Sequence, residues 1–248
     1  MENRYYSENI SKIPLPMLVQ ALAATMPRWI AWVLAIVVRT VDRFGKGLPP
    51  SHGVGFVGTE KVVGVDAIPA PAIARWAPLL EQLRDLGFEP IKCELAETVG
   101  TKLNCSTTLL DKLGTTTAIV EWSRMKGSAG MEEITPIELN SYRENAADIV
   151  TGIVRKIDVP MASMFEVDGV DMISLENNCP LAQRYQEHRD RCHDRQLMRL
   201  DTESALKVVH DRAQRRFAAL LKTGFLRELT AEEITELRNA DLTELYDF

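Results

Sequence analysis

The chain has 248 residues, of which 46% are hydrophobic and 26% are charged, and its formal net charge is −6. This length and composition suffice for one domain with a real hydrophobic core, or for one domain with helical extensions. The acidic balance argues against nucleic acid as the main partner, because phosphate binding needs a concentrated basic surface. Four cysteines are too few for a disulfide scaffold.

The N-terminal segment is the most informative part of the chain, because residues 15–38 carry a single formal charge, that of Arg28. Prolines suited to a first helical turn favour a helix over residues 15–26, and Pro27 ends it. A second helix is predicted over residues 28–44, because two glycines and a Pro-Pro pair follow it.

On a helical wheel this second helix separates into two sides. One narrow stripe holds small and polar side chains, among them Ala31 and Ala35, and would let another helix approach closely. The opposite face is apolar with flanking tryptophans, which is typical of a helix in the headgroup region of a membrane. The predicted docking residues are Trp29, Ile30, Trp32, Val33, Leu34, Val37, Val41 and Phe44.

Three arrangements of these two helices remain open. They are an interfacial or re-entrant membrane anchor, a single kinked helix that spans the membrane, and a helical hairpin buried in the protein core. A span needs about 20 apolar residues, which neither helix supplies alone. A joined helix would place Arg28 near the middle of the bilayer. A cleaved signal peptide is disfavoured, because no small-residue cleavage site follows the apolar run.

Charge also favours an N-terminal arm that docks to a membrane. Residues 1–47 contain six basic and three acidic residues, a net +3, so the remainder of this −6 chain carries −9. A basic apolar arm on an acidic body suits an anionic leaflet. Slightly more basic residues follow the apolar segment than precede it, which predicts a cytoplasmic body by the positive-inside rule.

The middle of the chain changes from linker to sheet. Residues 48–70 are predicted to form a linker that can hold one short strand. Residues 53–58 match G-x-G-x-x-G, but a nucleotide site needs a strand before and a helix after this motif, so linker glycines are expected. Residues 71–176 are predicted to form one domain, in which a first helix packs on an antiparallel meander of short, often β-branched runs.

The C-terminal part, residues 177–248, has a helical pattern. One helix is predicted over residues 181–200, and a second begins at residue 201 or 202. A capping box of Thr230 and Glu233 opens a third. The predicted fold class is therefore α+β, with an apolar helix–break–helix arm, one helix on an antiparallel β-meander, and three C-terminal helices.

The strongest candidate for a metal site lies around the first of these C-terminal helices. His188 and Cys192 are four residues apart, so both can face one ion, and zinc accepts mixed Cys and His ligands. The spacing matches no standard zinc module, and the neighbouring residues are rich in Arg and Asp. The candidate metal ligands are Cys179, His188, Cys192 and His193.

No other set of residues forms a diagnostic catalytic motif, and no catalytic residues are assigned. Cys105 and Ser106 lie in a predicted strand with nothing that marks an oxyanion hole. Trp76 and Trp122 fit the core, although they could line a ligand cavity between helix and sheet.

The sequence favours a membrane-associated, non-catalytic binding or accessory subunit that needs no cofactor. Its expected partner is a lipid bilayer surface or the apolar helices of a larger complex, and no nucleic acid. One alternative is a metalloprotein or small enzyme that uses zinc at the cysteine and histidine group. A second alternative is a soluble small-molecule carrier with a cavity beside Trp76 or Trp122.

Overall fold

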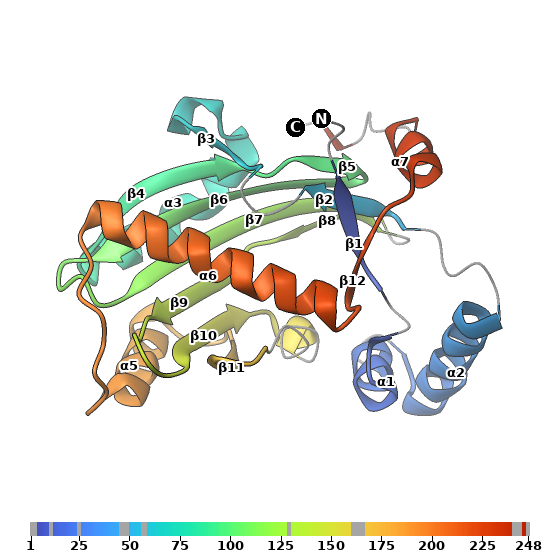
Figure 1. Cartoon of the computed structure of the whole chain (residues 1–248), viewed down its shortest axis with the longest axis horizontal. Coiled ribbons are helices and arrows are strands. Elements are labelled where there is room, and N and C mark those ends of the chain that lie inside the picture. Colours follow the sequence, from blue (N-terminus) through green and yellow to red (C-terminus); the bar gives the residue numbers. More distant parts are fainter. Residues whose placement is uncertain are drawn as a thin grey trace.

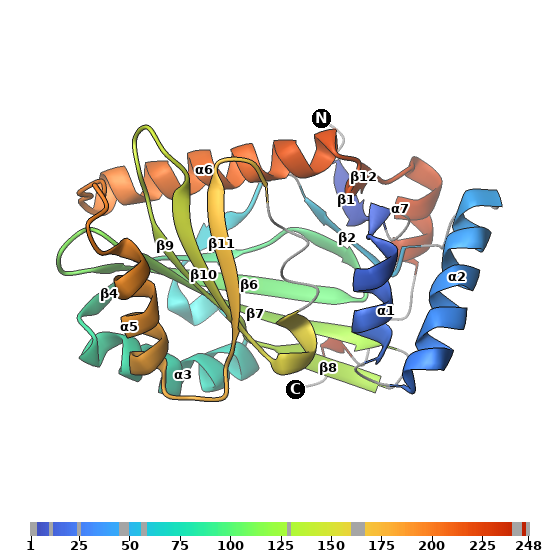
Figure 2. The same cartoon turned by 90° about the horizontal axis from the view of Figure 1, so that it is seen from below.

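The computed structural model describes residues 4–9, 12–23, 26–44, 50–55, 59–127, 130–159, 167–239 and 245–246. Within these ranges the chain has the predicted α+β fold, built on one large and mostly antiparallel sheet (Figure 1). A smaller sheet and two N-terminal helices lie at one end of the long axis of the molecule (Figures 1 and 2).

The large sheet has the strand order β11-β10-β9-β7-β6-β4-β3 in the described chain, and β8 pairs with β7. The predicted antiparallel meander is confirmed from β4 to β10. The strands are β3 (Lys61–Val63), β4 (Phe88–Leu95), β6 (Lys102–Asp111), β7 (Thr117–Gly127), β8 (Gly130–Ile134), β9 (Ile137–Ser141), β10 (Asp148–Val154) and β11 (Val170–Glu176).

The last strand corrects the predicted meander, because β10 and β11 are parallel. Parallel strands need a crossover connection rather than a tight turn. Residues 155–169 provide that connection, and its described part includes the short helix η3 (Lys156–Asp158). β11 begins at Val170, and residues 160–166 of the connection lie outside the described part of the chain.

Helices cover both faces of the large sheet (Figures 1 and 2). α3 (Ala70–Asp85) and α5 (Leu181–Cys192) lie on one face, and α6 (Thr202–Lys222) crosses the other. Side chains alternate between the two faces of a strand. Accordingly, Leu109 of β6 belongs to the core beneath α3, and the adjacent Leu110 belongs to the core beneath α6.

The C-terminal helices begin where the capping residues predict. Asp201 and Ser204 form a reciprocal capping box at the start of α6, and Thr230 and Glu233 form another at the start of α7 (Ala231–Arg238). The prediction that the preceding helix reaches residue 200 is wrong, because α5 ends at Cys192. Residues beyond it bond to other loops instead of to a helical ladder, as in the backbone bond from Met198 N to Tyr142 O.

Four short strands form a second sheet in the order β12-β1-β2-β5. They are β1 (Tyr5–Glu8), β2 (His52–Gly55), β5 (Thr98–Gly100) and β12 (Leu226–Glu228). β2 and β3 lie in the segment predicted as a linker with one short strand, so this part of the chain is more structured than expected. Gly53 of β2 packs closely against Leu229, because a Cβ there would lie 2.5 Å from Leu229 Cδ1 and that side chain would have to shift.

The two N-terminal helices are α1 (Leu15–Ala23) and α2 (Arg28–Phe44), and α2 has the predicted bounds. They fold back on one another, since Arg39 Nη2, late in α2, donates to Ile13 O, just before α1, at 3.0 Å. Ala31 and Ala35 are fully buried in the same cluster as Leu18 of α1. The predicted close approach of a second helix along the alanine stripe is therefore confirmed.

Candidate functional site

The outward side of α2 carries large apolar side chains along its described length. Their exposed fractions range from 36% for Ile30 to 71% for Trp29. We call this surface the α2 face, and its described members are Trp29, Ile30, Trp32, Val33, Leu34, Ile36, Val37 and Val41.

The structure places seven of the eight predicted docking residues on the α2 face. The side chain of Phe44, the eighth, lies outside the described part of the chain. Sequence reasoning missed Ile36, which is 51% exposed. At about 100° per residue, Ile36 falls between Trp29 and Trp32 on the helical wheel. The positions of Trp29 and Trp32 on the wheel could therefore have predicted that Ile36, which lies between them, is exposed too.

The opposite side of α2 is a packing seam. Ala31 and Ala35 have no exposed surface, and Arg39 uses its guanidinium to hold the backbone before α1. This stripe therefore faces protein rather than forming a polar edge in water. Small side chains allow the two helix backbones to approach, and the large side chains of α2 are left on the outside.

The apolar arc of α2 spans about 200°, from Trp32 to Leu34, at the angular spacing of an α-helix. Thr40 lies within this arc, and its Oγ1 donates to Ile36 O at 2.8 Å. That bond satisfies the hydroxyl within the helix, so Thr40 does not depend on water for its donor. Arg43, whose side chain lies outside the described part of the chain, falls between Trp32 and Ile36 on the same wheel, so one cation also belongs to this arc.

The dimensions of the hairpin distinguish between the arrangements left open by the sequence. Among the described residues, no helix combines the length and the apolar composition needed to cross a bilayer. α2 is about 25 Å long at about 1.5 Å per residue, against about 30 Å of hydrocarbon. The two helices run antiparallel, which differs from a single kinked span, and the exposed α2 face contradicts a hairpin buried in the core.

Large exposed apolar side chains elsewhere in the described chain are scattered. Val62 lies on β3, Val65 in the short helix η2 (Val65–Ala67), Leu113 in the turn between β6 and β7, and Tyr246 near the C-terminus. Isolated exposed apolar residues are ordinary on soluble proteins, whereas a contiguous patch marks an interaction surface. The α2 face is the contiguous one.

His188 lies in a buried polar network between α5 and the large sheet. The ring is fully buried, with Nδ1 2.9 Å from Thr151 Oγ1 and Nε2 3.1 Å from Ser141 Oγ. Burial, together with the nearby charge of Arg191, lowers the pKa of His188 to about 4. The imidazole is therefore neutral at pH 7, and it joins α5 to two strands through hydroxyl groups.

The four candidate metal ligands do not converge on one point. Cys192 Sγ lies 3.7 Å from His188 Nε2, but His193 is exposed to solvent and Cys179 lies beside the Arg184 guanidinium. A cationic neighbour disfavours a metal ion at that thiol. Within the described residues, no three Cys, His, Asp or Glu side chains are grouped so that they could hold a metal ion.

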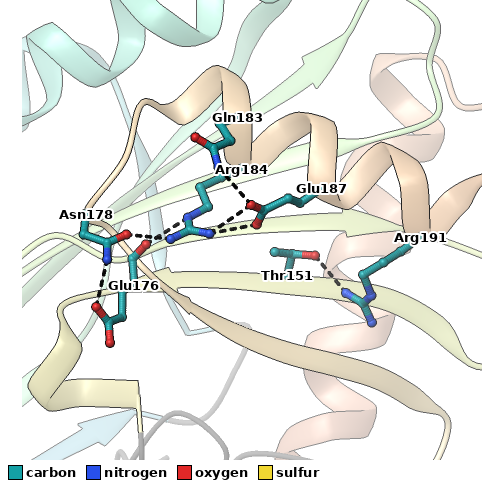
Figure 3. Close-up of polar contacts among 7 residues, drawn as sticks. All are labelled: Thr151, Glu176, Asn178, Gln183, Arg184, Glu187 and Arg191. Atoms are coloured by element: carbon teal, nitrogen blue, oxygen red, sulfur yellow. Dashed lines mark hydrogen bonds and ion pairs between the residues drawn. The ribbon is translucent and has the colours of Figure 1, made fainter.

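Two arginines connect α5 to the edge of the large sheet (Figure 3). Arg184 Nε donates to Glu176 O at 2.9 Å, and its Nη1 donates to both carboxylate oxygens of Glu187. Arg191 Nη1 donates to Thr151 Oγ1 at 2.8 Å, which extends the network around His188. These hydrogen bonds leave both guanidinium groups well partnered and give them a structural role.

The remaining sequence candidates are core side chains. Trp76 and Trp122 are fully buried between α3 and the sheet, and neither indole N–H meets an acceptor in the described part of the chain. Cys105 lies in β6, as predicted, and burial raises the pKa of its thiol to about 12. A thiol with so high a pKa is a poor nucleophile.

Comparison with known proteins yields no match to a family model, to a curated protein or to a solved structure.

Proposed function

We propose that the protein is a membrane-associated accessory subunit that binds the surface of a lipid bilayer through the α2 face. The observation that carries this proposal is a single helix that exposes eight large apolar side chains in the described chain and buries alanines. In this proposal the rest of the molecule is a non-catalytic domain held at the membrane surface.

The width of the apolar arc favours lipid over a partner helix. A helix packed against protein typically uses an apolar stripe of roughly 100°. The part of the α2 arc from Ile36 to Leu34 spans about 160° at about 100° per residue, so a single partner helix would leave part of it in water. Acyl chains and headgroups are fluid and can surround a convex surface. A helix lying in the membrane plane would be covered in this way.

The distribution of tryptophans and cations along the hairpin also supports an interfacial position. Trp29 and Trp32 lie in the first two turns of α2, and tryptophan prefers the boundary between hydrocarbon and headgroups. Arg28 is exposed at the start of the helix. Lys12 is exposed next to Ile13, whose carbonyl binds Arg39 near the other end. Cations near both ends of α2 fit an anionic leaflet.

The expected binding is reversible. Each large side chain is already partly buried, so moving its remaining surface out of water contributes about 1 kcal/mol. Eight such contributions are comparable to the effect of one acyl chain, which gives marginal and reversible membrane binding. We therefore expect peripheral attachment from one leaflet, in agreement with the length of α2.

The proposal is tested by flotation of the full-length chain with lipid vesicles rich in phosphatidylserine. The chain should float with these vesicles, and Val33→Glu combined with Val37→Glu should remain in the dense fraction. A matched control, Val62→Glu with Val65→Glu, changes two somewhat more exposed valines away from α2 and should float like the original chain.

Two outcomes would overturn the proposal. One is that the unsubstituted chain stays monomeric in detergent-free buffer and does not bind the vesicles. The other is a soluble oligomer that Val33→Glu with Val37→Glu dissociates, because that result would assign the α2 face to a protein partner.

A further inference from the structure

A second feature lies at the opposite end of the long axis from α2. A cavity of about 270 Å³ is lined by residues 143–146, in the turn between β9 and β10, and by residues 196–199, in the connection from α5 to α6. Both views show these elements far from the N-terminal hairpin (Figures 1 and 2). A ligand there would not share the α2 face.

Hydrogen bonds hold the walls of this cavity in place. Met198 N donates to Tyr142 O at 2.9 Å, and Leu200 N donates to Gly114 O at 2.7 Å. Gly114 has a φ of +67°, and a side chain there would collide with the Leu200 backbone, so the close approach depends on glycine. On the other wall, Arg143 N donates to Asp148 Oδ1 at 2.9 Å.

The charges around the cavity favour an anion. Arg143 Nε has no acceptor in the described residues, and the hydrogen bond from its Nη1 to Ala147 O is long at 3.5 Å. Asp148 is ion-paired to Arg212 at 2.9 Å, so that carboxylate is already neutralised. Arg199 is exposed on the opposite wall. Glu144 is the acidic residue in the lining, which leaves one net positive charge there.

We propose that this cavity binds a small anionic molecule through a carboxylate or phosphate group held between Arg143 and Arg199. Guanidinium groups match the geometry of carboxylate and phosphate oxygens and form strong charge-assisted hydrogen bonds with them. The lining also offers the Asn145 and Gln196 amides and the Met198 side chain for the uncharged part of the molecule.

The cavity is partly open to solvent, and its volume favours a small ligand. Its volume of about 270 Å³ lies just below the range of about 300–1,000 Å³ typical of drug-sized ligands. The expected molecule is therefore small, with one or two acidic groups. This inference goes beyond membrane docking and does not depend on it.

Calorimetric titration of the full-length protein with two probes, inorganic phosphate and succinate, tests the inference without vesicles. We expect saturable binding of at least one probe. Arg143→Gln and Arg199→Gln should each weaken it about tenfold or more, because each removes a charge-assisted hydrogen bond. Arg195→Gln removes an exposed arginine of the same connection outside the cavity and should bind like the original chain.

The two probes separate phosphate recognition from carboxylate recognition. Absence of saturable binding by either probe would overturn the inference. Equal weakening in Arg195→Gln would show a bulk charge effect and would also overturn it. Binding that survives both Arg143→Gln and Arg199→Gln would mean an adventitious ion only. Arg199 is exposed, so its variant tests the idea even if Arg143→Gln fails to fold.

Discussion

α2 and α5 are two helices that pack against the same protein in opposite ways. α5 buries Leu181, Tyr185 and His188, and its outward side is charged. α2 buries Ala31 and Ala35, and its outward side is apolar. A helix gains stability from packing its large apolar side chains against a core. α5 follows this rule and α2 does not, and the proposed docking of the α2 face would account for the difference.

The largest expected effect on stability lies on the α5 side of this comparison. His188→Ala should lower the free energy of unfolding by about 3 kcal/mol or more, because it leaves a cavity and removes one hydrogen-bond partner each from Ser141 and Thr151. Urea denaturation measures the change. Gln186→Ala, an exposed position on the same helix, is the control and should stay within about 0.5 kcal/mol. Equal effects would mean that the buried network is unimportant.

The same network predicts a pH dependence of stability. The pKa of folded His188 is lowered to about 4, whereas an unfolded histidine titrates near its ordinary 6.5. As the pH falls through this interval the unfolded chain binds a proton that the folded chain does not, so stability decreases. Between about pH 7 and pH 5 the expected loss is about 2 kcal/mol. His188→Gln removes the titrating group and should flatten this part of the profile.

Substitutions in the seam between α1 and α2 should also lower the free energy of unfolding, although by less. Ala35→Leu forces a larger side chain into a position without exposed surface, and overpacking of this kind costs about 1–3 kcal/mol. Thermal unfolding of the variant measures the loss. Ile36→Leu, on the exposed side one residue further, is the matched control. An unchanged melting temperature for Ala35→Leu would contradict the packed seam.

The smallest expected effect on stability is on the α2 face itself. Val37→Ala should change the free energy of unfolding by less than about 0.5 kcal/mol, because this side chain is 49% exposed and contributes little to the core. Urea denaturation in detergent-free buffer checks this. A loss of about 2 kcal/mol would show that the α2 face supports the fold, as a buried side chain would.

The parts of the fold that were predictable are those with local signals. The bounds of α2 follow from Pro27 and the trailing glycines, and the alanine seam follows from its wheel. β1 and β12 were missed because each is only three or four residues long and gains its stability from a distant partner, as in the pairing of Tyr6 with Glu228. Such strands leave too short a pattern to recognise.

The candidate sites also differ in whether a local sequence pattern predicts them. The α2 face was predictable because its residues repeat at helical spacing within one segment. His188 was expected as a metal ligand, since nothing local indicates that Ser141 and Thr151 face its two nitrogens. The cavity beside Arg143 had no sequence signal, because its second wall, which includes Arg199, comes from a segment predicted to be helical.

Tryptophan fluorescence of the 248-residue chain with anionic vesicles tests directly whether the α2 face enters a bilayer. Trp29 and Trp32 are exposed, while Trp76 and Trp122 are already buried, so a change in emission reports on α2. We expect a blue shift and quenching by spin-labelled lipids, and both should be lost in Trp29→Phe with Trp32→Phe. Emission that stays unchanged at saturating lipid would contradict it.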